Sequence, residues 1–130
     1  MKRKHRVILV VLAVLVLGYL GIKIAMGRVE AAHQRLFAEI IADVDLTKIA
    51  DGTYDGSYSL FPVMAEVKVA VTDHRITDIK LIKHRNGQGS WAEAMLTKVV
   101  DAQSLDVDIV TGATLSSKVI LRAIAEALGQ

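Results

Sequence analysis

The sequence predicts an α+β protein in which an N-terminal transmembrane helix precedes an antiparallel sheet with helices packed on it. Three patterns predict this fold: an uncharged apolar run at residues 7–22, an alternation of apolar side chains at residues 63–72, and two later segments with helical spacing. We divide the chain into a signal anchor at residues 1–27, an amphipathic linker helix at residues 28–50 and one domain at residues 51–130. A chain of 130 residues has room for one such domain.

The anchor prediction depends on sixteen uncharged residues, Val7–Ile22, that follow the basic cluster Lys2–Arg6. Counting on to Met26, with the amine of Lys23 reaching outward, gives a length close to the roughly 20 residues that cross a bilayer. A cleaved signal peptide with its site at Ala25–Gly27 is the alternative, but the long apolar run and Lys23 favour an uncleaved anchor. Either way, the positive-inside rule predicts a cytoplasmic N-terminus and an extracytoplasmic domain. The anchor also implies contact with membrane lipid.

Composition excludes several classes of function. Residues 1–27 hold five of the sixteen basic residues and no acidic residue, which leaves residues 28–130 with eleven basic and fourteen acidic residues, a net charge of −3. The basic character therefore belongs to the leader and does not support nucleic-acid binding. The chain has no cysteine, which excludes disulfides, thiolate metal sites and iron–sulfur clusters.

Between anchor and domain, residues 29–44 place apolar side chains at helical spacing and predict an amphipathic helix. Asp45 is expected to cap a short turn that runs through Ile49, and Gly52 is expected to end it. These features predict a linker rather than a part of the domain.

Three strands are predicted next. They are Tyr54–Leu60, residues 63–72 and Ile76–His84, with Pro62 between the first two, where its missing N–H does least harm. Asp73–His74 is expected to form the hairpin turn, because both residue types tolerate left-handed backbone angles. The sheet is therefore expected to be antiparallel.

Two helices complete the domain. Ser90 and Glu93 fit a capping box for a helix over Trp91–Ala102. The last helix is expected over Leu115–Leu128, with an apolar stripe along one side, and Gly129 is expected to end it.

The stretch Asp108–Ser117 stands directly before the last helix and contains the tetrapeptide Thr111–Thr114. An unpaired helix N-terminus with a glycine and several hydroxyls suits a phosphate, but the same residues also suit a helix whose N-cap is Thr114. No strained nucleophile motif and no metal-ligand spacing occur, so we predict neither a catalytic residue nor a metal site.

Three motifs together resemble the FMN-binding domain family: Asp51–Gly56, His84–Gly89 and Asp108–Ser117. The resemblance covers residues 51–128 and implies FMN as the cofactor. This family supplies flavin-carrying subunits to ion-pumping respiratory complexes and to extracellular electron-transfer chains. The resemblance therefore implies an electron-transfer flavoprotein rather than a stand-alone enzyme, with redox partners at the membrane.

In this family the last threonine of the Ser/Thr-Gly-Ala-Thr stretch carries FMN through a phosphodiester that a separate flavin transferase makes from FAD. The resemblance therefore implies Thr114 as the attachment residue and the transferase as a partner. Other cofactor-binding candidates come from the same stretch and from the loop after the third strand. They are Thr111, Gly112, Ala113, Leu115, Ser116 and Ser117, and His84, Asn86, Gly87, Gly89 and Trp91.

Alternatives remain open at this stage. Trp91 fits a half-buried anchor of its own helix as well as a partner for the flavin ring, and His84 fits an ordinary strand-end residue. FMN could be bound reversibly through the helix N-terminus. A third hypothesis is a flavin-free module that docks a membrane complex through Leu36 and Phe37 of the linker helix.

Overall fold

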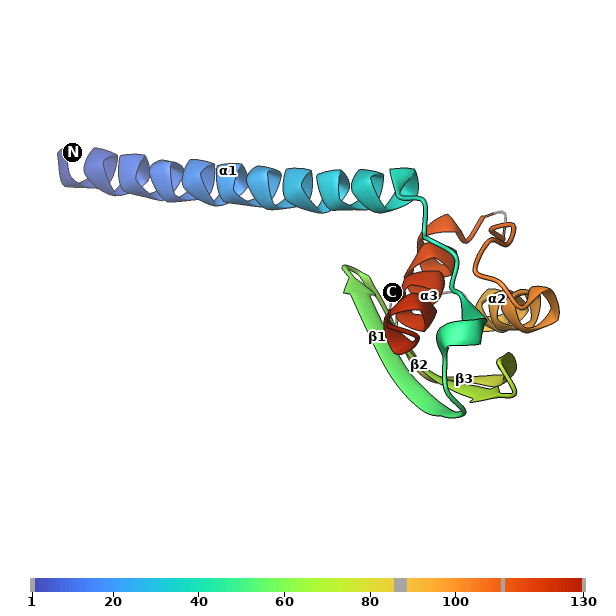
Figure 1. Cartoon of the computed structure of the whole chain (residues 1–130). Helices are drawn as coiled ribbons and strands as arrows, with labels where there is room; N and C mark the ends of the chain where they lie inside the picture. Colours follow the sequence, from blue (N-terminus) through green and yellow to red (C-terminus); the bar gives the residue numbers. More distant parts are fainter. Residues whose placement is uncertain (1, 86–88, 111, 130) are drawn as a thin grey trace. The chain divides into compact units, whose positions relative to one another are not determined.

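A computed structural model describes residues 2–85, 89–110 and 112–129, and its helices and strands are drawn in Figure 1. In chain order the elements are α1 (Lys2–Ala38), the 3-10 helix η1 (Leu46–Lys48), β1 (Gly52–Leu60), β2 (Val63–Thr72), β3 (Arg75–Arg85), α2 (Gly89–Ala102) and α3 (Thr114–Ala127). The predicted α+β class is confirmed, as is the order of one helix, three strands and two helices. The chain divides into two compact units, Met1–Gln34 and Arg35–Gln130.

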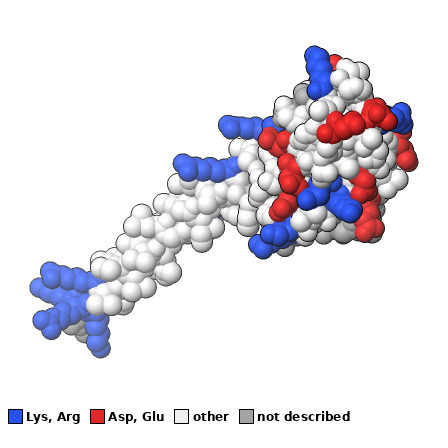
Figure 2. Space-filling model, turned by 60° about the horizontal axis from the view of Figure 1, so that its bottom comes forward, with Lys and Arg blue, Asp and Glu red and all other residues white. Residues whose placement is uncertain are grey.

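The first unit consists of the greater part of α1. Its large apolar side chains between Val7 and Met26 are all exposed. Figure 2 shows the Lys and Arg side chains gathered at the N-terminal end of this helix, followed by a stretch that carries almost no charge. The helix is long and apolar enough to cross a membrane, by length and composition.

The predicted linker helix is wrong beyond residue 38, because α1 ends at Ala38 and residues 39–45 are not helical. Contacts with the domain hold this segment instead: the amine of Lys118 donates to the carbonyl of Glu39 at 2.7 Å, and the Leu105 N–H donates to the Asp43 carboxylate at 2.9 Å. Tertiary hydrogen bonds here override the helical spacing of the apolar residues.

This segment also contributes to the core of the second unit. Leu36 is 2% exposed and Val44 is 8% exposed. The compact unit therefore begins at Arg35, earlier than the boundary expected at Asp51. Because Leu36 is a core residue, its side chain is unavailable for docking a partner, whereas Phe37 is 44% exposed.

The sheet has the order β1-β2-β3 and is antiparallel throughout, as the alternation at residues 63–72 predicts. The core-facing side chains of the central strand are all buried: Val63, Ala65, Val67, Val69 and Val71. The predicted hairpin turn is confirmed, with Asp73 at φ 51° and His74 at φ 58°. Pro62 lies in the turn between β1 and β2, as expected, after a cis peptide bond.

Helices α2 and α3 pack against the sheet: α3 contacts β1 and β2, and α2 contacts β3 and α3 (Figure 1). The predicted apolar stripe of α3 is confirmed, since Val119, Ile120, Ala123, Ile124, Ala127 and Leu128 are all buried. The approach of α3 to β1 is so close that a Cβ on Gly56 would overlap the Ala123 carbonyl oxygen and would lie 2.6 Å from the Cβ of Ala127. Glycine at this position allows the helix to lie directly on the strand.

Candidate functional site

The site is built around the start of α3, where Thr114 is the first helical residue. The N-cap is Ala113, with φ −130° and ψ 40°, and it makes no side-chain capping hydrogen bond. The interpretation of Thr114 as the N-cap is therefore wrong, because the helix begins one residue earlier than that role requires. The Thr114 side chain is exposed, so its hydroxyl is free to react or to bind.

The residues directly before Thr114 form a tight turn with an unobstructed glycine. Gly112 has φ 83°, and no atom lies within 4 Å of the position that its Cβ would occupy. The Ala113 N–H donates to the Val110 carbonyl at 3.1 Å, which closes a turn directly before the helix. Thr111 lies outside the described residues. The space on the Cβ side of Gly112 is therefore open among the described residues.

The other hydroxyls of the motif face the interior. Ser116 is 6% exposed and Ser117 is 1% exposed, and Leu115 packs against the core. The Oγ of Ser117 is buried and has no hydrogen-bond partner among the described residues. Ser116 and Ser117 are shielded from solvent in this conformation, so their role as donors to a phosphate stays a prediction. Among the hydroxyls that the structure describes in this stretch, Thr114 alone is exposed.

The loop after β3 is described only at its two ends. Asn86 and Gly87 lie outside the described residues, Gly89 is the first residue of α2, and the side chain of Trp91 is likewise outside the described part. Their predicted contacts with the flavin therefore stay predictions. Of the candidates in this motif, His84 is the one whose side chain the structure describes, and it lies one residue before the end of β3.

His84 lies opposite the fully buried Ala65 of β2 and is itself half-buried. Burial lowers the pKa of its imidazole below the ordinary value of 6.5, which favours the neutral ring at pH 7. Its Nε2 is shielded from solvent and has no hydrogen-bond partner in the described part of the chain. An unpaired buried polar atom costs about 1–3 kcal/mol, so it needs an explanation.

The fold brings the two motifs to the same end of the sheet. On β1, Gly56 meets Ala123 and Ala127, whereas the ring of Tyr58 lies 5.6 Å from the Arg122 guanidinium carbon. Moving along β1 toward Leu60 therefore means moving along α3 toward its N-terminus. That end of the sheet is also where β3 ends and α2 begins, since β2 residue 64 pairs with β3 residue 85. The start of α3 and the end of β3 thus lie at the same end of the sheet.

The segment after α1 supports this site and was not anticipated as part of it. Asp43 accepts hydrogen bonds from the Ser104 hydroxyl at 2.7 Å and from the N–H groups of Leu105 and Val44. Burial raises the pKa of Asp43, but these hydrogen bonds outweigh burial and hold the pKa below the ordinary value of 3.8. The carboxylate fixes the chain directly upstream of residues 106–114. No pattern in the sequence could show this, because the bonds from Ser104 and Leu105 join residues about sixty positions apart.

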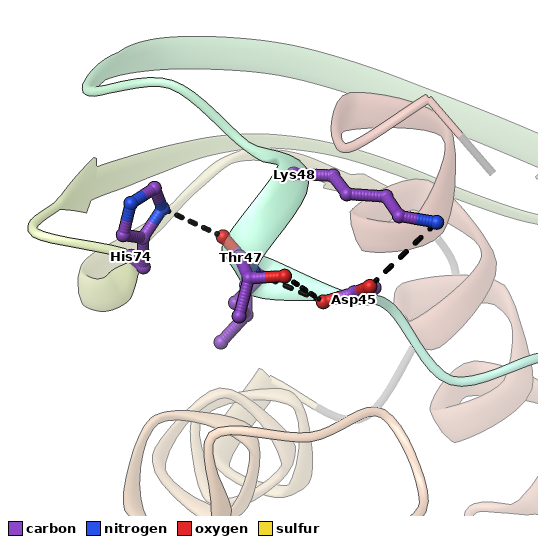
Figure 3. Close-up of polar contacts among 5 residues, drawn as sticks. Asp45, Thr47, Lys48 and His74 are labelled. Carbon is purple, nitrogen blue, oxygen red and sulfur yellow. Dashed lines mark hydrogen bonds and ion pairs between the residues drawn. The ribbon is translucent and has the colours of Figure 1, made fainter.

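The predicted capping of the turn after this segment by Asp45 is confirmed, but the turn ends at Lys48 and not at Gly52, which is the first residue of β1. Asp45 is the N-cap of η1 and accepts from the Thr47 N–H at 3.1 Å and from the Thr47 hydroxyl at 2.6 Å (Figure 3). The Nδ1 of His74 lies 3.1 Å from the Leu46 carbonyl and 3.2 Å from the Ile49 carbonyl, so it must carry a proton that it donates to them. η1 is thus attached to the β2–β3 turn, away from the end of the sheet where α3 begins.

Residues 63–129 match the model of the FMN-binding domain, which is more than half of the chain. The fold and the match together define a flavin-binding protein. The chain belongs to the FMN-binding domain family, and FMN is its cofactor. The match begins at β2. The compact domain of the structure also includes β1 and the segment after α1, which precede the matched residues.

One relative is an uncharacterized protein of Treponema pallidum (strain Nichols), which is 33% identical over 86 residues. The alignment covers 64% of this chain and 24% of the relative. This chain therefore spans about a quarter of the length of the relative that it matches, and the relative's name states no function.

Proposed function

We propose that this protein is a membrane-anchored, extracytoplasmic electron carrier whose FMN is attached covalently through its phosphate to Thr114. The observation that carries the proposal is the exposed hydroxyl of Thr114 at a helix N-terminus that no side chain among the described residues caps, in a domain of the FMN-binding family. Helix N-termini bind phosphates through free N–H groups and the positive end of the helix dipole.

The attachment is a substitution at phosphorus. The hydroxyl of Thr114 loses its proton, its Oγ forms a bond to the FMN phosphorus of FAD, and the bond to AMP breaks so that AMP leaves. The resulting phosphodiester keeps one negative charge beside the start of α3, where the dipole stabilises an anion. The exposure of Thr114 and the open Cβ side of Gly112 favour access of a flavin transferase to the hydroxyl. Flavin supplies the redox chemistry, and this chain supplies position and electrostatics.

The membrane part of the proposal is supported by α1. Its apolar stretch and the basic residues at its N-terminal end favour a single span with the N-terminus in the cytoplasm. The domain would then meet its redox partners and the flavin transferase outside the cytoplasmic membrane. Residues 35–130 carry more acidic than basic side chains, which gives no support for nucleic-acid binding.

The test is the intact mass of the full chain after co-expression with a flavin transferase. We expect a gain of one FMN less one water, and we expect no gain for Thr114→Ala. Thr114→Ser, which keeps a hydroxyl, should be modified at least in part. Thr97→Ala is the matched control, because Thr97 is an exposed threonine on α2. A Thr114→Ala protein that keeps flavin through denaturation contradicts the proposed attachment.

The same preparation separates the alternatives. If FMN is bound reversibly, the native protein is yellow but a denaturing gel shows no fluorescent band, because only a covalent flavin migrates with the chain. If neither colour nor added mass occurs with an active transferase, the electron-carrier proposal fails. The docking hypothesis would then be tested at Phe37 alone, since Leu36 is a core residue.

A further inference from the structure

The two edge strands of the sheet differ in how they are protected from pairing with another chain. β3 has two register irregularities against β2 and carries the exposed lysines Lys80 and Lys83. The side-chain amide of Gln103 also exchanges two hydrogen bonds of 2.8 Å with the backbone of Ile76 on this strand. Bulges, lysines and covering groups are the features with which natural sheets protect an edge, so the β3 edge is blocked to a further strand.

β1, at the other edge of the sheet, lacks these features (Figure 1). It pairs with β2 in one unbroken register over its nine residues, Gly52–Leu60, and it contains neither lysine nor proline. Among the described residues, no segment other than β2 forms a backbone hydrogen bond with β1. A long and regular edge with unpaired N–H and C=O groups is a template for the addition of another strand.

We propose that β1 pairs in antiparallel orientation with β1 of a second copy of this chain, so that the two three-stranded sheets become one. The strand is centred on Gly56, so a two-fold axis at Gly56 allows all nine residues to pair. This register places Tyr54, which packs against the core, opposite Tyr58 of the second copy as an aromatic cross-strand pair. It also places Asp55 opposite Ser57, whereas an axis at Asp55 would oppose two carboxylates.

The charges on α3 fit the same two-fold axis. Gly56 meets Ala123, and next to this contact Arg122 lies over the ring of Tyr58 and pairs with Glu126 at 3.6 Å. An axis at Gly56 runs the two α3 helices antiparallel and brings Arg122 of each copy toward Glu126 of the other. Because α3 contacts both β1 and β2, and strands lie about 4.8 Å apart, the two helices would lie about 10 Å apart, a normal distance for packed helices.

The pairing also suits two anchors in one membrane. A two-fold axis between antiparallel strands of one sheet is perpendicular to the sheet, so both copies keep their helices on the same side. Lys118 and Ala127 lie on opposite sides of α3, because nine residues at about 100° each make two and a half turns. Ala127 faces β1, whereas Lys118 donates to the carbonyl of Glu39. Both copies therefore present Glu39, directly after α1, on the same side of the joined sheet.

The first test uses the absence of cysteine from the chain. In the proposed register Thr53 lies opposite Ser59 of the second copy, whereas the same two residues within one strand are about 20 Å apart. The full chain with both Thr53→Cys and Ser59→Cys is oxidised in vesicles of phosphatidylcholine and phosphatidylglycerol and run on a non-reducing gel. We expect a covalent dimer, and we expect monomers for each single variant and for Thr53→Cys with Ser57→Cys. A Thr53→Cys/Ser59→Cys protein that stays monomeric, or single variants that cross-link equally well, overturn the inference.

The second test uses charge at the same two positions. Thr53→Lys with Ser59→Lys opposes like charges at both ends of the paired strands, whereas Thr53→Lys with Ser59→Glu opposes unlike charges. Sedimentation of the full chain in density-matched detergent measures the dimer Kd. We expect the Lys/Lys variant to raise the Kd about tenfold and the Lys/Glu variant to keep it near the wild-type value. A monomeric wild type, or a dimer that the Lys/Lys variant does not weaken, contradicts the pairing of β1.

The pairing is independent of the flavin. Thr114→Ala should dimerise as wild type does, because Thr114 is not part of β1. Failure of flavin attachment in a protein that still cross-links would therefore contradict the proposed function alone, and a flavin-loaded monomer would contradict the pairing alone.

Discussion

The two ends of α3 differ in how the rest of the chain contacts them. Toward its C-terminus the helix lies so close to β1 that Gly56 has no room for a methyl group between itself and Ala123 or Ala127. At its N-terminus Thr114 is exposed, Ala113 provides no side-chain cap, and no atom lies within 4 Å of the position that a Cβ on Gly112 would occupy. One end of the helix therefore serves packing, whereas the other leaves a hydroxyl and the N–H groups of the first turn for a ligand.

The start of η1, in the same domain, differs from the start of α3 in its capping. η1 begins with a complete side-chain cap, because Asp45 accepts from both the N–H and the hydroxyl of Thr47 (Figure 3). The protein thus caps a helix where only structure is needed and leaves the start of α3 without such a cap. Substitutions at the packed end should lower the free energy of unfolding, and substitutions at the open end should lower flavin content.

The largest loss of stability is expected for Gly56→Ala at the packed end. The added methyl would overlap backbone atoms of α3 that cannot move independently, so we expect a loss of about 3 kcal/mol in the free energy of unfolding. Urea denaturation of the full chain in detergent measures this loss. Ser57→Ala, at the exposed neighbouring residue, should change the free energy by less than about 0.5 kcal/mol. Equal effects of the two substitutions would show that α3 does not lie this close to β1.

Asp43 is expected to give the next largest effect, because it holds the chain upstream of the open end. Removing its three hydrogen bonds in Asp43→Ala should cost about 1–2 kcal/mol, a value reduced by the exposure of its side chain. Since folding lowers its pKa, its contribution is fully present above the unfolded-state pKa and is lost as the pH falls through the folded-state pKa.

The pH dependence supplies the control for Asp43. Wild type should lose stability below about pH 4 more steeply than Asp43→Ala, because only wild type has this carboxylate to protonate. Free energies of unfolding at several pH values between 7 and 3 measure both slopes. Parallel curves for wild type and Asp43→Ala would contradict the hydrogen bonds assigned to this carboxylate.

A smaller and matched pair of effects is expected at the two glycines that flank α3. Gly112 has φ 83°, Gly129 has φ 79°, and neither has an atom within 4 Å of its Cβ position. Alanine at either position should cost about 1 kcal/mol, because only the backbone angle is strained. We expect Gly112→Ala to slow flavin attachment and Gly129→Ala to leave its rate unchanged, as measured by the mass gained over time. Equal rates would indicate that the transferase does not need the space beside Gly112.

The smallest effect on stability is expected for Thr114→Ala, although it should remove all covalent flavin. The side chain is exposed and makes no capping bond, and alanine is a good helix former, so the free energy of unfolding of the unloaded protein should change by less than about 0.5 kcal/mol. Thermal or urea denaturation of unloaded wild type and variant measures this difference. A large loss of stability would mean that Thr114 has a structural role that the exposed hydroxyl does not indicate.

Local patterns in the sequence predicted most of the fold. The alternation at residues 63–72, the turn at Asp73–His74 and the apolar stripe of α3 each depend on neighbouring residues, and all three are confirmed. The end of α1 was predicted too late because hydrogen bonds from Lys118 and Leu105, far along the chain, hold residues 39–45 out of the helix. Thr114 could be singled out by the family resemblance, whereas the burial of Ser116 and Ser117 depends on how α3 packs and could not.

The most direct test of the central claim is to locate the flavin within the chain. Trypsin should release the peptide Val99–Lys118, which contains Thr114 together with Thr111, Ser116 and Ser117. Tandem mass spectrometry of this peptide from flavin-loaded wild type should place the added mass on Thr114 alone, because its hydroxyl is the exposed one among those described in this stretch. An added mass on Ser116 or Ser117, or none on this peptide from a protein that carries covalent flavin, would contradict the account.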